Sequence, residues 1–368
     1  MRASTGVYYE KLDHVRALAA FLVFTWHFVH TSNIVPFKVV PAFALFSFFE
    51  DGHTGVALFM TLSGYIFAKL IDDRDIDYGA FLWNRFVRLA PLLIVVLVVT
   101  YALQMYHGQP FYEVLKAFIA GFVIPIWPNG GWSLTVEVHF YLVLPFLLRM
   151  VRHRADAALY VVLAMLAVRY LLYVEIGQIQ DLAYWTIVGR VDQFTLGIFA
   201  FYAGRTARPG RPIVLLAAAS FLVFFHAFNV QGGFYGNEGY PSRDPIWIVM
   251  PAIEGAFYSL MIWSYDKADW SLPAGLSRVV SFVGKISYSI YLIHFFVVFR
   301  LADAFVLHVV SAPSYEMMFL ASFGAFILIL PFAWLSHRFI EGAFMRFRTT
   351  YIRDLTLPAR EDEKPASA

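Results

Sequence analysis

Long apolar stretches recur along the whole chain, and they restrict it to one class of fold. The hydrocarbon core of a bilayer is about 30 Å thick, so a helix that crosses it needs roughly 20 mostly apolar residues. A shorter, proline-broken apolar segment at 111–126 is expected to be interfacial or re-entrant. We predict an all-α, polytopic integral membrane protein of about ten transmembrane helices, near 12–31, 54–71, 89–106, 135–151, 157–175, 184–204, 213–229, 247–265, 286–305 and 317–338.

Composition agrees with lipid as the surrounding solvent. Hydrophobic residues make up 60% of the 368 residues and charged residues 15%, whereas soluble proteins carry about 25% charged residues. The chain has no cysteine, which excludes disulfides, zinc–thiolate sites and thiol nucleophiles. A net charge of +2 is too small to indicate a nucleic-acid partner.

The basic residues are distributed unevenly between alternate loops. If the N-terminus is cytoplasmic, most Lys and Arg residues fall on the cytoplasmic side, and the opposite side holds only Lys38, Lys116, Arg243 and Arg300. Cytoplasmic loops of membrane proteins carry such an excess. We therefore predict cytoplasmic N- and C-termini, one membrane domain at 1–345 and a short polar cytoplasmic tail at 346–368.

Two ionisable residues share one face of the first predicted helix. Arg16 and His27 are eleven residues apart, which corresponds to about 20° around a helix and ~16 Å along it. Asp13 precedes Arg16 by three residues and is placed to pair with it. Charges inside a membrane are costly and usually mark function. An arginine reaching the lipid headgroups and a histidine bonded to a neighbouring helix would also account for the pattern.

Two arginines stand together ahead of the third predicted span. Arg85 and Arg88 are one helical turn apart, next to Trp83. Paired guanidinium groups suit phosphate oxygens. By spacing alone, a charge pair that orients the chain against anionic lipid is the commoner interpretation.

Two further groups of polar residues lie in predicted spans. Glu137 follows Trp132 and Ser133 at the outer end of its helix, where Ser133 is a candidate N-cap, although a carboxylate in a first helical turn is also favourable for purely electrostatic reasons. The residues Ser287, Tyr291 and His294 form a stripe along one helix face, and hydrogen bonds between helices would satisfy them equally well. Additional candidates, for which pairing within the membrane is a sufficient account, are Arg190, Asp192, His337 and Glu341.

The order of these motifs resembles the membrane acyltransferase-3 family, the sugar O-acyltransferases. The resemblance extends from Leu12 to Glu341. It rests on LDHVR with a histidine eleven residues after the arginine, FMTLSG, RFVRLAP, WSLTVEVHFYLVLP, GRVDQFTLGIFA and KISYSIYLIH. Two segments depart from the family pattern. Val138 and His139 stand where Glu and Gln are frequent, and Gly342 and Ala343 stand where Arg and Pro are common.

The resemblance implies transfer of an acyl group, commonly acetyl from acetyl-CoA, to a hydroxyl of a carbohydrate or glycoconjugate. On this basis we expect His27 to act as general base with Arg16 and Asp13 beside it, and Arg85, Arg88 and Arg16 to bind the coenzyme A phosphates. No metal is expected. Candidate acceptor-binding residues are Glu137, Trp132, Tyr288, Tyr291, His294 and Arg190.

Other functions and several details stay open at this stage. A transporter of a lipid-linked saccharide or acyl group would also need intramembrane Arg, His and Glu, although no internal repeat of the kind frequent in transporters is evident. A scaffold or receptor would gain nothing from burying these residues. The acyl group, the acceptor and the side of transfer are undetermined. The expected partners are membrane lipids and the acceptor, and the resemblance favours a bacterial inner membrane.

Overall fold

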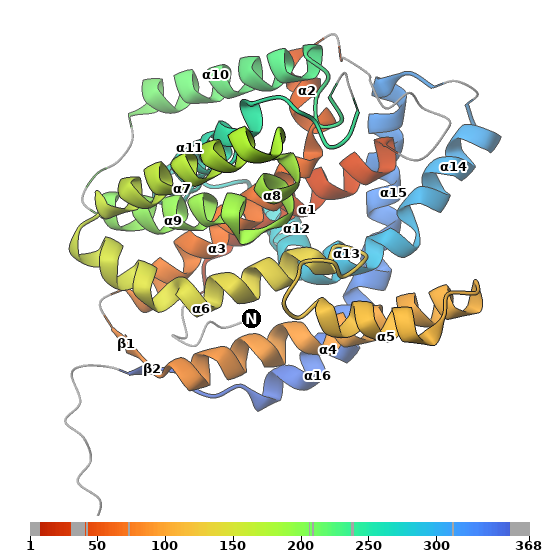
Figure 1. Ribbon diagram of the computed structural model, residues 1–368, viewed down its shortest axis with the longest axis horizontal. Helices are drawn as coiled ribbons and strands as arrows, with labels where there is room; N and C mark the ends of the chain where they lie inside the picture. The colour runs from red at the N-terminus through yellow and green to blue at the C-terminus, as the bar shows by residue number, and fades with distance from the viewer. Residues whose placement is uncertain are drawn as a thin grey trace, which may run out of the picture.

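The computed structural model is almost entirely helical (Figure 1). It describes residues 8–30, 41, 43–72, 74–205, 207, 210–236, 239–310 and 313–353, and 80% of the structure is helix. Two short strands, β1 (Asp75–Ile76) and β2 (Ile352–Arg353), pair antiparallel at one end of α4. The predicted all-α class is confirmed. Residues 354–368 of the predicted tail lie outside the described residues.

The helices follow one another with short connections. The first half contains α1 (Glu10–Val29), α2 (Ala44–Glu50), η1 (Gly52–Thr54), α3 (Gly55–Ile71), α4 (Tyr78–Tyr106), α5 (Phe111–Ala120), α6 (Gly131–His153) and α7 (Ala157–Ile176). The second half contains α8 (Gln180–Trp185), α9 (Ile187–Ala203), α10 (Arg211–Val230), α11 (Ile246–Lys267), α12 (Ala274–Lys285), α13 (Ser287–Ile293), η2 (His294–Phe296), α14 (Val298–His308), α15 (Tyr315–Ser336), η3 (His337–Glu341), α16 (Gly342–Phe344) and η4 (Met345–Phe347).

Eight helices in the described part of the chain are long and apolar enough to cross a membrane. They are α1, η1 with α3, α4, α6, α7, α10, α11 and the helix that begins with α15. The pair formed by α12 and Ser287–Phe296, bent by 52°, would make a ninth. The predicted number of ten is therefore not confirmed. Helix α5 has only 10 residues, too few to span a bilayer, as expected for the 111–126 segment.

Two predicted spans are interrupted in the structure. The segment at 184–204 breaks at Thr186, whose extended backbone and side chain cap α9, so that α9 has 17 residues. The segment at 286–305 divides into α13, η2 and α14. The chain also bends by 52° between α12 and the Ser287–Phe296 segment. Both segments are predominantly apolar, so their average hydropathy does not reveal these breaks.

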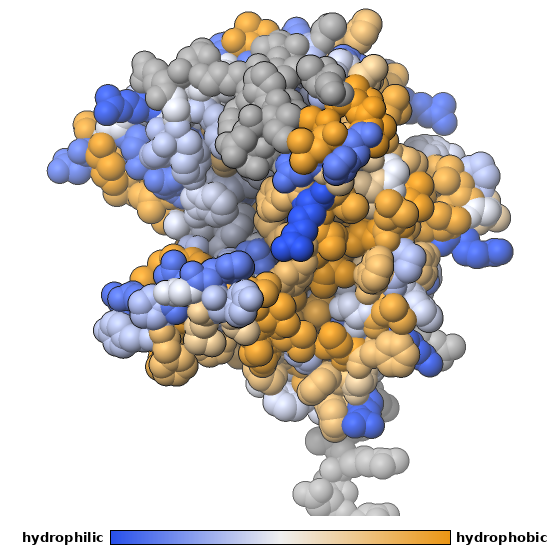
Figure 2. Space-filling view, turned by 90° about the vertical axis from the view of Figure 1, so that its right-hand side faces the viewer, coloured by the Kyte–Doolittle hydropathy of each residue, from blue (hydrophilic) through white to orange (hydrophobic). Residues whose placement is uncertain are grey.

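The surface of the molecule is largely apolar. Figure 2 shows broad hydrophobic areas on the face opposite β1 and β2, with charged side chains gathered in separate groups. Only 22% of the residues in the apolar stretch of α7, and the same share in α10, are buried. Both helices expose large side chains such as Leu163, Leu171 and Leu216. Apolar patches of this extent are unusual on soluble monomers and fit contact with lipid.

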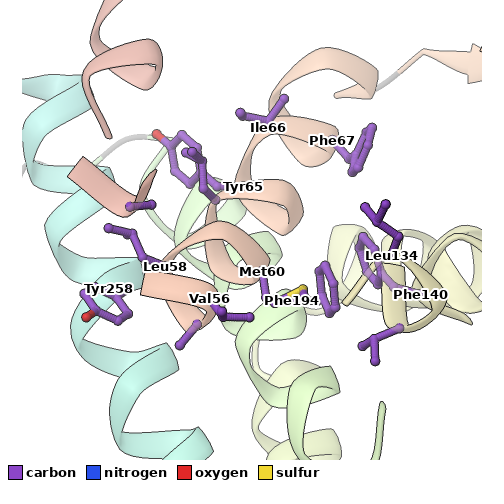
Figure 3. Packing of buried hydrophobic residues seen from close by; sticks show 14 of the residues in the cluster. Val56, Leu58, Met60, Tyr65, Ile66, Phe67, Leu134, Phe140, Phe194 and Tyr258 are labelled. Carbon is purple, nitrogen blue, oxygen red and sulfur yellow. The ribbon is translucent and has the colours of Figure 1, made fainter. Parts of the chain in front are cut away.

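Helix α3 lies at the centre of the core, packed against α1, α9 and α11. Figure 3 shows its side chains, including Val56, Met60 and Phe67, meeting residues of α6, α9 and α11. The backbones of α3 and α9 approach closely because each has a glycine at the contact. A Cβ at Gly64 would lie 2.0 Å from the carbonyl oxygen of Phe194, and one at Gly197 would lie 2.0 Å from that of Thr61. Small residues serve this purpose widely in membrane helix pairs.

A buried ion pair joins α7 to α9, and the same arginine reaches α11. The Arg169 guanidinium in α7 lies 2.7 Å from the Asp192 carboxylate in α9 and donates to the Ile248 carbonyl in α11 at 2.7 Å. Both charged side chains are fully buried. Asp192 is thereby accounted for by pairing within the membrane.

The close contact of α3 with α9 generates a prediction. Replacing Gly64 by Val forces side-chain atoms against the Phe194 backbone, which cannot yield without separating the helices. We expect a stability loss of about 2 kcal/mol or more, measured as a lower midpoint of thermal unfolding in detergent. Gly324→Val in α15, where a Cβ would meet open space, is the matched control. Equal stability of the two variants would contradict this packing.

The expected membrane orientation can be tested with single cysteines, because the chain has none of its own. Cytoplasmic termini predict that His107→Cys, after α4, reacts with an impermeant maleimide in intact cells. The same orientation predicts that Arg154→Cys, between α6 and α7, reacts only after permeabilisation. The reverse labelling pattern would overturn the orientation.

Candidate active site

A cavity of about 400 Å³ lies between α1, α3, α4, α6 and α13 and is also lined by residues 348–351. We call it the basic cavity. Its lining holds more cations than carboxylates, which favours an anionic ligand. The charged lining residues are Arg16, Arg85, Arg88, Lys285 and Arg348, with Asp13 and Glu137.

Arg85 and Arg88 enter the basic cavity from α4. This helix begins earlier than expected, at Tyr78, because the Asp77 side chain accepts from the Ala80 backbone N–H at 3.0 Å and caps it. The Arg85 guanidinium lies 5.2 Å from the centre of the Phe67 ring, and its Nε is buried without a hydrogen-bond partner. Among the described residues, neither arginine forms an ion pair with a carboxylate. Both therefore retain hydrogen-bond donors for a ligand.

Arg16 lines the same cavity and forms the expected pair with Asp13. Its Nη1 lies 2.6 Å from Asp13 Oδ1, one turn earlier on α1. The predicted pairing is confirmed, while the roles assigned to the two residues remain predictions. The carboxylate holds the guanidinium on the side of α1 that faces Arg85 and Arg88.

A second cavity of about 290 Å³ lies beyond the basic cavity, at the N-terminal end of α6. We call it the aromatic cavity. Its walls come from α1, α3, α8, the loop at 125–130 and the segment around α13 and η2. The lining residues include His27, His53, Trp26, Trp127, Trp132, Tyr184, Trp185, Tyr291 and Phe295.

His27 presents one ring nitrogen to this cavity through a defined tautomer. Its Nδ1 lies 2.8 Å from the Val23 carbonyl, so Nδ1 carries the proton. His294 Nδ1 lies 2.7 Å from the Tyr291 carbonyl and is protonated for the same reason. His294 Nε2 is consequently an acceptor, 3.3 Å from His27 Nδ1. These contacts leave the lone pair of His27 on Nε2, the arrangement that a general base requires.

The two cavities adjoin at Tyr291 and Val56, which line both. The Tyr291 hydroxyl donates to Ser133 Oγ at 2.9 Å and fixes α13 to α6. A Cβ at Gly130, whose φ is +78°, would lie 2.8 Å from the Tyr291 ring. Glycine is therefore required there both by the backbone conformation and by the close approach of the ring.

The structure distributes the other predicted acceptor residues between the two cavities. Trp132 and Tyr291 line the aromatic cavity, whereas Glu137 and Tyr288 line the basic one. Glu137 accepts a hydrogen bond from the Tyr141 hydroxyl, and the Tyr288 hydroxyl donates to the Leu89 carbonyl at 2.5 Å.

Two predicted acceptor residues lie behind the cavity walls. His294 is buried and reaches the aromatic cavity only through His27. Arg190 is also buried; it donates to the Tyr184 carbonyl at 2.8 Å and lies 3.8 Å from Glu254. Its guanidinium stacks on the Tyr184 ring at 4.4 Å. Arg190 therefore supports an aromatic wall residue.

The expected N-cap at Ser133 is wrong. Helix α6 begins at Gly131, after Gly130 in a left-handed conformation, and the Ser133 hydroxyl donates to the Gly130 carbonyl at 2.9 Å. The glycine pair lets the chain turn sharply before α6. Glu137 consequently lies almost two turns into the helix, where it faces the basic cavity.

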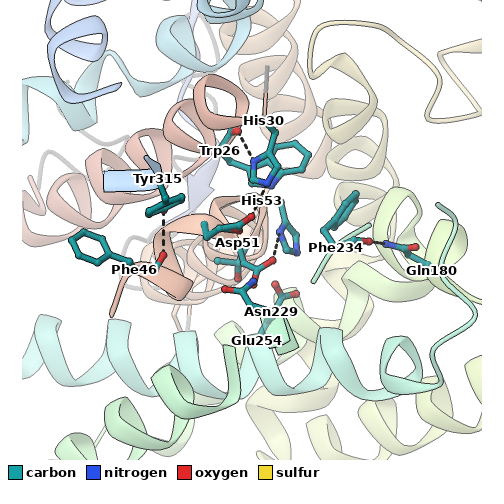
Figure 4. Close-up of polar contacts among 12 residues, drawn as sticks. Trp26, His30, Phe46, Asp51, His53, Gln180, Asn229, Phe234, Glu254 and Tyr315 are labelled. Carbon is teal, nitrogen blue, oxygen red and sulfur yellow. Dashed lines mark hydrogen bonds and ion pairs between the residues drawn. The ribbon is translucent and has the colours of Figure 1, made fainter. Parts of the chain in front are cut away.

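His53 is a second histidine of the aromatic cavity that the sequence reasoning missed. Figure 4 shows it beside a group of buried polar residues that includes Asp51, Asn229 and Glu254. Neither ring nitrogen of His53 has a hydrogen-bond partner, and the nearest carboxylate oxygen, on Asp51, lies 3.6 Å from Nδ1. The only sequence signal was its position in GHTG, directly before the FMTLSG helix.

One comparison with known proteins identifies a family for the chain. A family model described as an acyltransferase domain, Acyl_transf_3, matches residues 9–338. No curated protein and no solved structure shows a significant match to the chain. The matched region contains helices α1 to α15 and therefore both histidines of the aromatic cavity, His27 and His53. The chain is a multi-pass integral membrane protein, and it belongs to the membrane acyltransferase-3 family.

Proposed function

We propose that the protein transfers an acyl group, most simply acetyl, from acyl-CoA to a hydroxyl of a carbohydrate or glycoconjugate. The observation that carries this proposal is the meeting of a cationic cavity with an aromatic one beside His27. An anionic donor and a polar acceptor can then approach the same point from opposite sides. The proposed location of the protein is a bacterial inner membrane.

The donor occupies the basic cavity. Arg85 and Arg88 bind its phosphate oxygens, for which planar guanidinium groups are well suited, and Arg16 extends the cationic wall along α1. The pantetheine arm runs along α1 towards Tyr291. The rise from Arg16 to His27, about 16 Å for eleven helical residues, has the scale of that extended arm. Glu137 and Tyr288 are placed to contact the donor.

The acceptor occupies the aromatic cavity. Trp132 and Tyr291 offer rings and a hydroxyl, the combination of apolar body and polar handle that these side chains provide. The walls at Trp127 and Trp185 enclose the same space. Acceptor contact at these residues is part of the proposal.

His27 Nε2 removes the proton from the acceptor hydroxyl as its oxygen attacks the thioester carbonyl. Collapse of the tetrahedral intermediate breaks the carbon–sulfur bond, and the leaving thiolate takes the proton from His27. The thioester is already activated, so the protein mainly positions the partners and excludes water. His294 orients His27 through Nδ1. No acyl-enzyme is needed for this sequence.

Removing the base tests the mechanism. His27→Ala is expected to lower transfer from acetyl-labelled acetyl-CoA by about 100-fold or more while donor affinity is kept. Incorporation of label into cellular glycoconjugates and donor binding to protein in nanodiscs measure the two quantities. His308→Ala, at the exposed C-terminal end of α14 and outside both cavities, is the matched control. Full transfer in His27→Ala would refute the base assignment.

Removing one donor contact tests the basic cavity. Arg85→Ala or Arg88→Ala is expected to weaken acetyl-CoA binding by about tenfold or more, the usual scale for a charge-assisted hydrogen bond. The effect should shrink as salt is raised. Arg154→Ala, an exposed arginine paired with Asp156, should bind normally. Unchanged binding in both cavity variants, or binding without turnover in the wild type, would favour the transporter.

A further inference from the structure

The chain beyond the last long helix turns back along α4. We call residues 347–353 the strap. The Trp83 indole N–H donates to the Phe347 carbonyl at 2.9 Å, the Asp77 backbone N–H donates to the Tyr351 carbonyl at 2.8 Å, and β2 pairs with β1. Figure 1 shows this segment beside the start of α4. The strap is therefore fixed to α4 at several points.

Asn84 provides the tightest of these attachments. Its side-chain amide donates to the Thr349 carbonyl at 2.5 Å, and its Oδ1 accepts from the Thr349 N–H at 2.9 Å. One side chain thus satisfies both backbone groups of a strap residue, as a neighbouring strand would. Asn84 lies one residue before Arg85, so the strap is held directly over the start of the arginine pair.

The strap brings a fourth arginine, Arg348, into the basic cavity, which Arg16, Arg85 and Arg88 also line. Residues 348–351 all line this cavity, and Arg348 Nε is buried there without a hydrogen-bond partner. No carboxylate among the described residues forms an ion pair with Arg348. Burial, together with the charges of Arg88 and Arg85, lowers the pKa of Arg348 to about 9. Arg85, Arg88 and Arg348 thus line one space, and none of the three forms an ion pair with a carboxylate in the described part of the chain.

Arg348 also lies outside the region that matches the family model, which ends at residue 338. The family relationship therefore assigns it no role. Like charges in a partly buried site repel one another, and an anionic ligand in this space would offset the repulsion among Arg85, Arg88 and Arg348.

We propose that Arg348 binds the 3′-phosphate end of the coenzyme A nucleotide, and that the strap closes the basic cavity over that nucleotide. The inference rests on the proposed function and extends it. Coenzyme A carries a diphosphate and, at the end remote from its sulfur, a separate 3′-phosphate. Arg85 and Arg88 on α4 bind the diphosphate, and Arg348 on the strap is the cation placed for the remote group.

The test compares coenzyme A with dephospho-coenzyme A, which lacks only the 3′-phosphate, on the full-length protein in nanodiscs. The wild type is expected to bind coenzyme A about tenfold more tightly than the dephospho form. Arg348→Ala should abolish this preference by weakening coenzyme A alone, and Arg348→Lys should restore part of it. Arg346→Ala removes an exposed arginine that stacks on Phe347 and should keep the full preference.

Two further measurements distinguish a role of Arg348 in nucleotide binding from a role in the stability of the protein. Thermal stability of the ligand-free Arg348→Ala protein should equal or exceed that of the wild type, because a repulsion is removed. Asn84→Ala, which removes one attachment of the strap without removing a charge, should reduce the preference as well.

The outcomes are distinct. A wild type that binds neither nucleotide refutes the proposed donor together with this inference. A wild-type preference that persists in Arg348→Ala refutes the inference alone, and so does an equal loss of affinity for both nucleotides.

Discussion

The backbone contact of α3 with α9 through Gly64 and Gly197 is the constraint on which the remaining structure depends. It sets α3 in the middle of the bundle, between α1 on one side and α9 with α11 on the other. One helix consequently supplies wall residues to both cavities: Phe59, Met60 and Ser63 to the basic cavity and Val56 to both. A wider separation of α3 and α9 would displace these walls from α1, and with them the geometry around His27.

Helix α1 carries a proposed functional residue in each cavity. Arg16 faces the basic cavity and His27 the aromatic cavity, and both lie on one rigid element. In the proposed reaction, a charged donor therefore stays near one surface while only its neutral arm enters the membrane interior. This separation avoids the cost of burying phosphate charge in lipid. In the proposed reaction, an acceptor that fills the aromatic cavity displaces water, which would otherwise compete with its hydroxyl for the thioester.

Much of this could be predicted from the sequence, and the failures have physical causes. Hydropathy located most of the long helices, and helical spacing correctly paired Arg16 with Asp13, because both are local properties of one helix. Hydropathy did not reveal the break at Thr186, since a capping side chain inside an apolar run leaves the average unchanged. The sequence favours Ser133 as a cap because serine is a preferred N-cap residue, whereas the left-handed turn at Gly130 that starts α6 carries no hydrophobic signal. The positions of His53 and Arg348 depend on contacts between segments far apart in sequence, which no local pattern encodes.

The central claim is that donor and acceptor meet beside His27 from two different cavities. The measurement that tests it most directly is an experimental structure with a non-transferable acyl-CoA analogue in which a thioether replaces the thioester. The account predicts the phosphates against Arg85 and Arg88 and the acyl group beside Tyr291, facing His27 Nε2. A nucleotide in the aromatic cavity, or an acyl group that stays at the outer surface of α4, would contradict it.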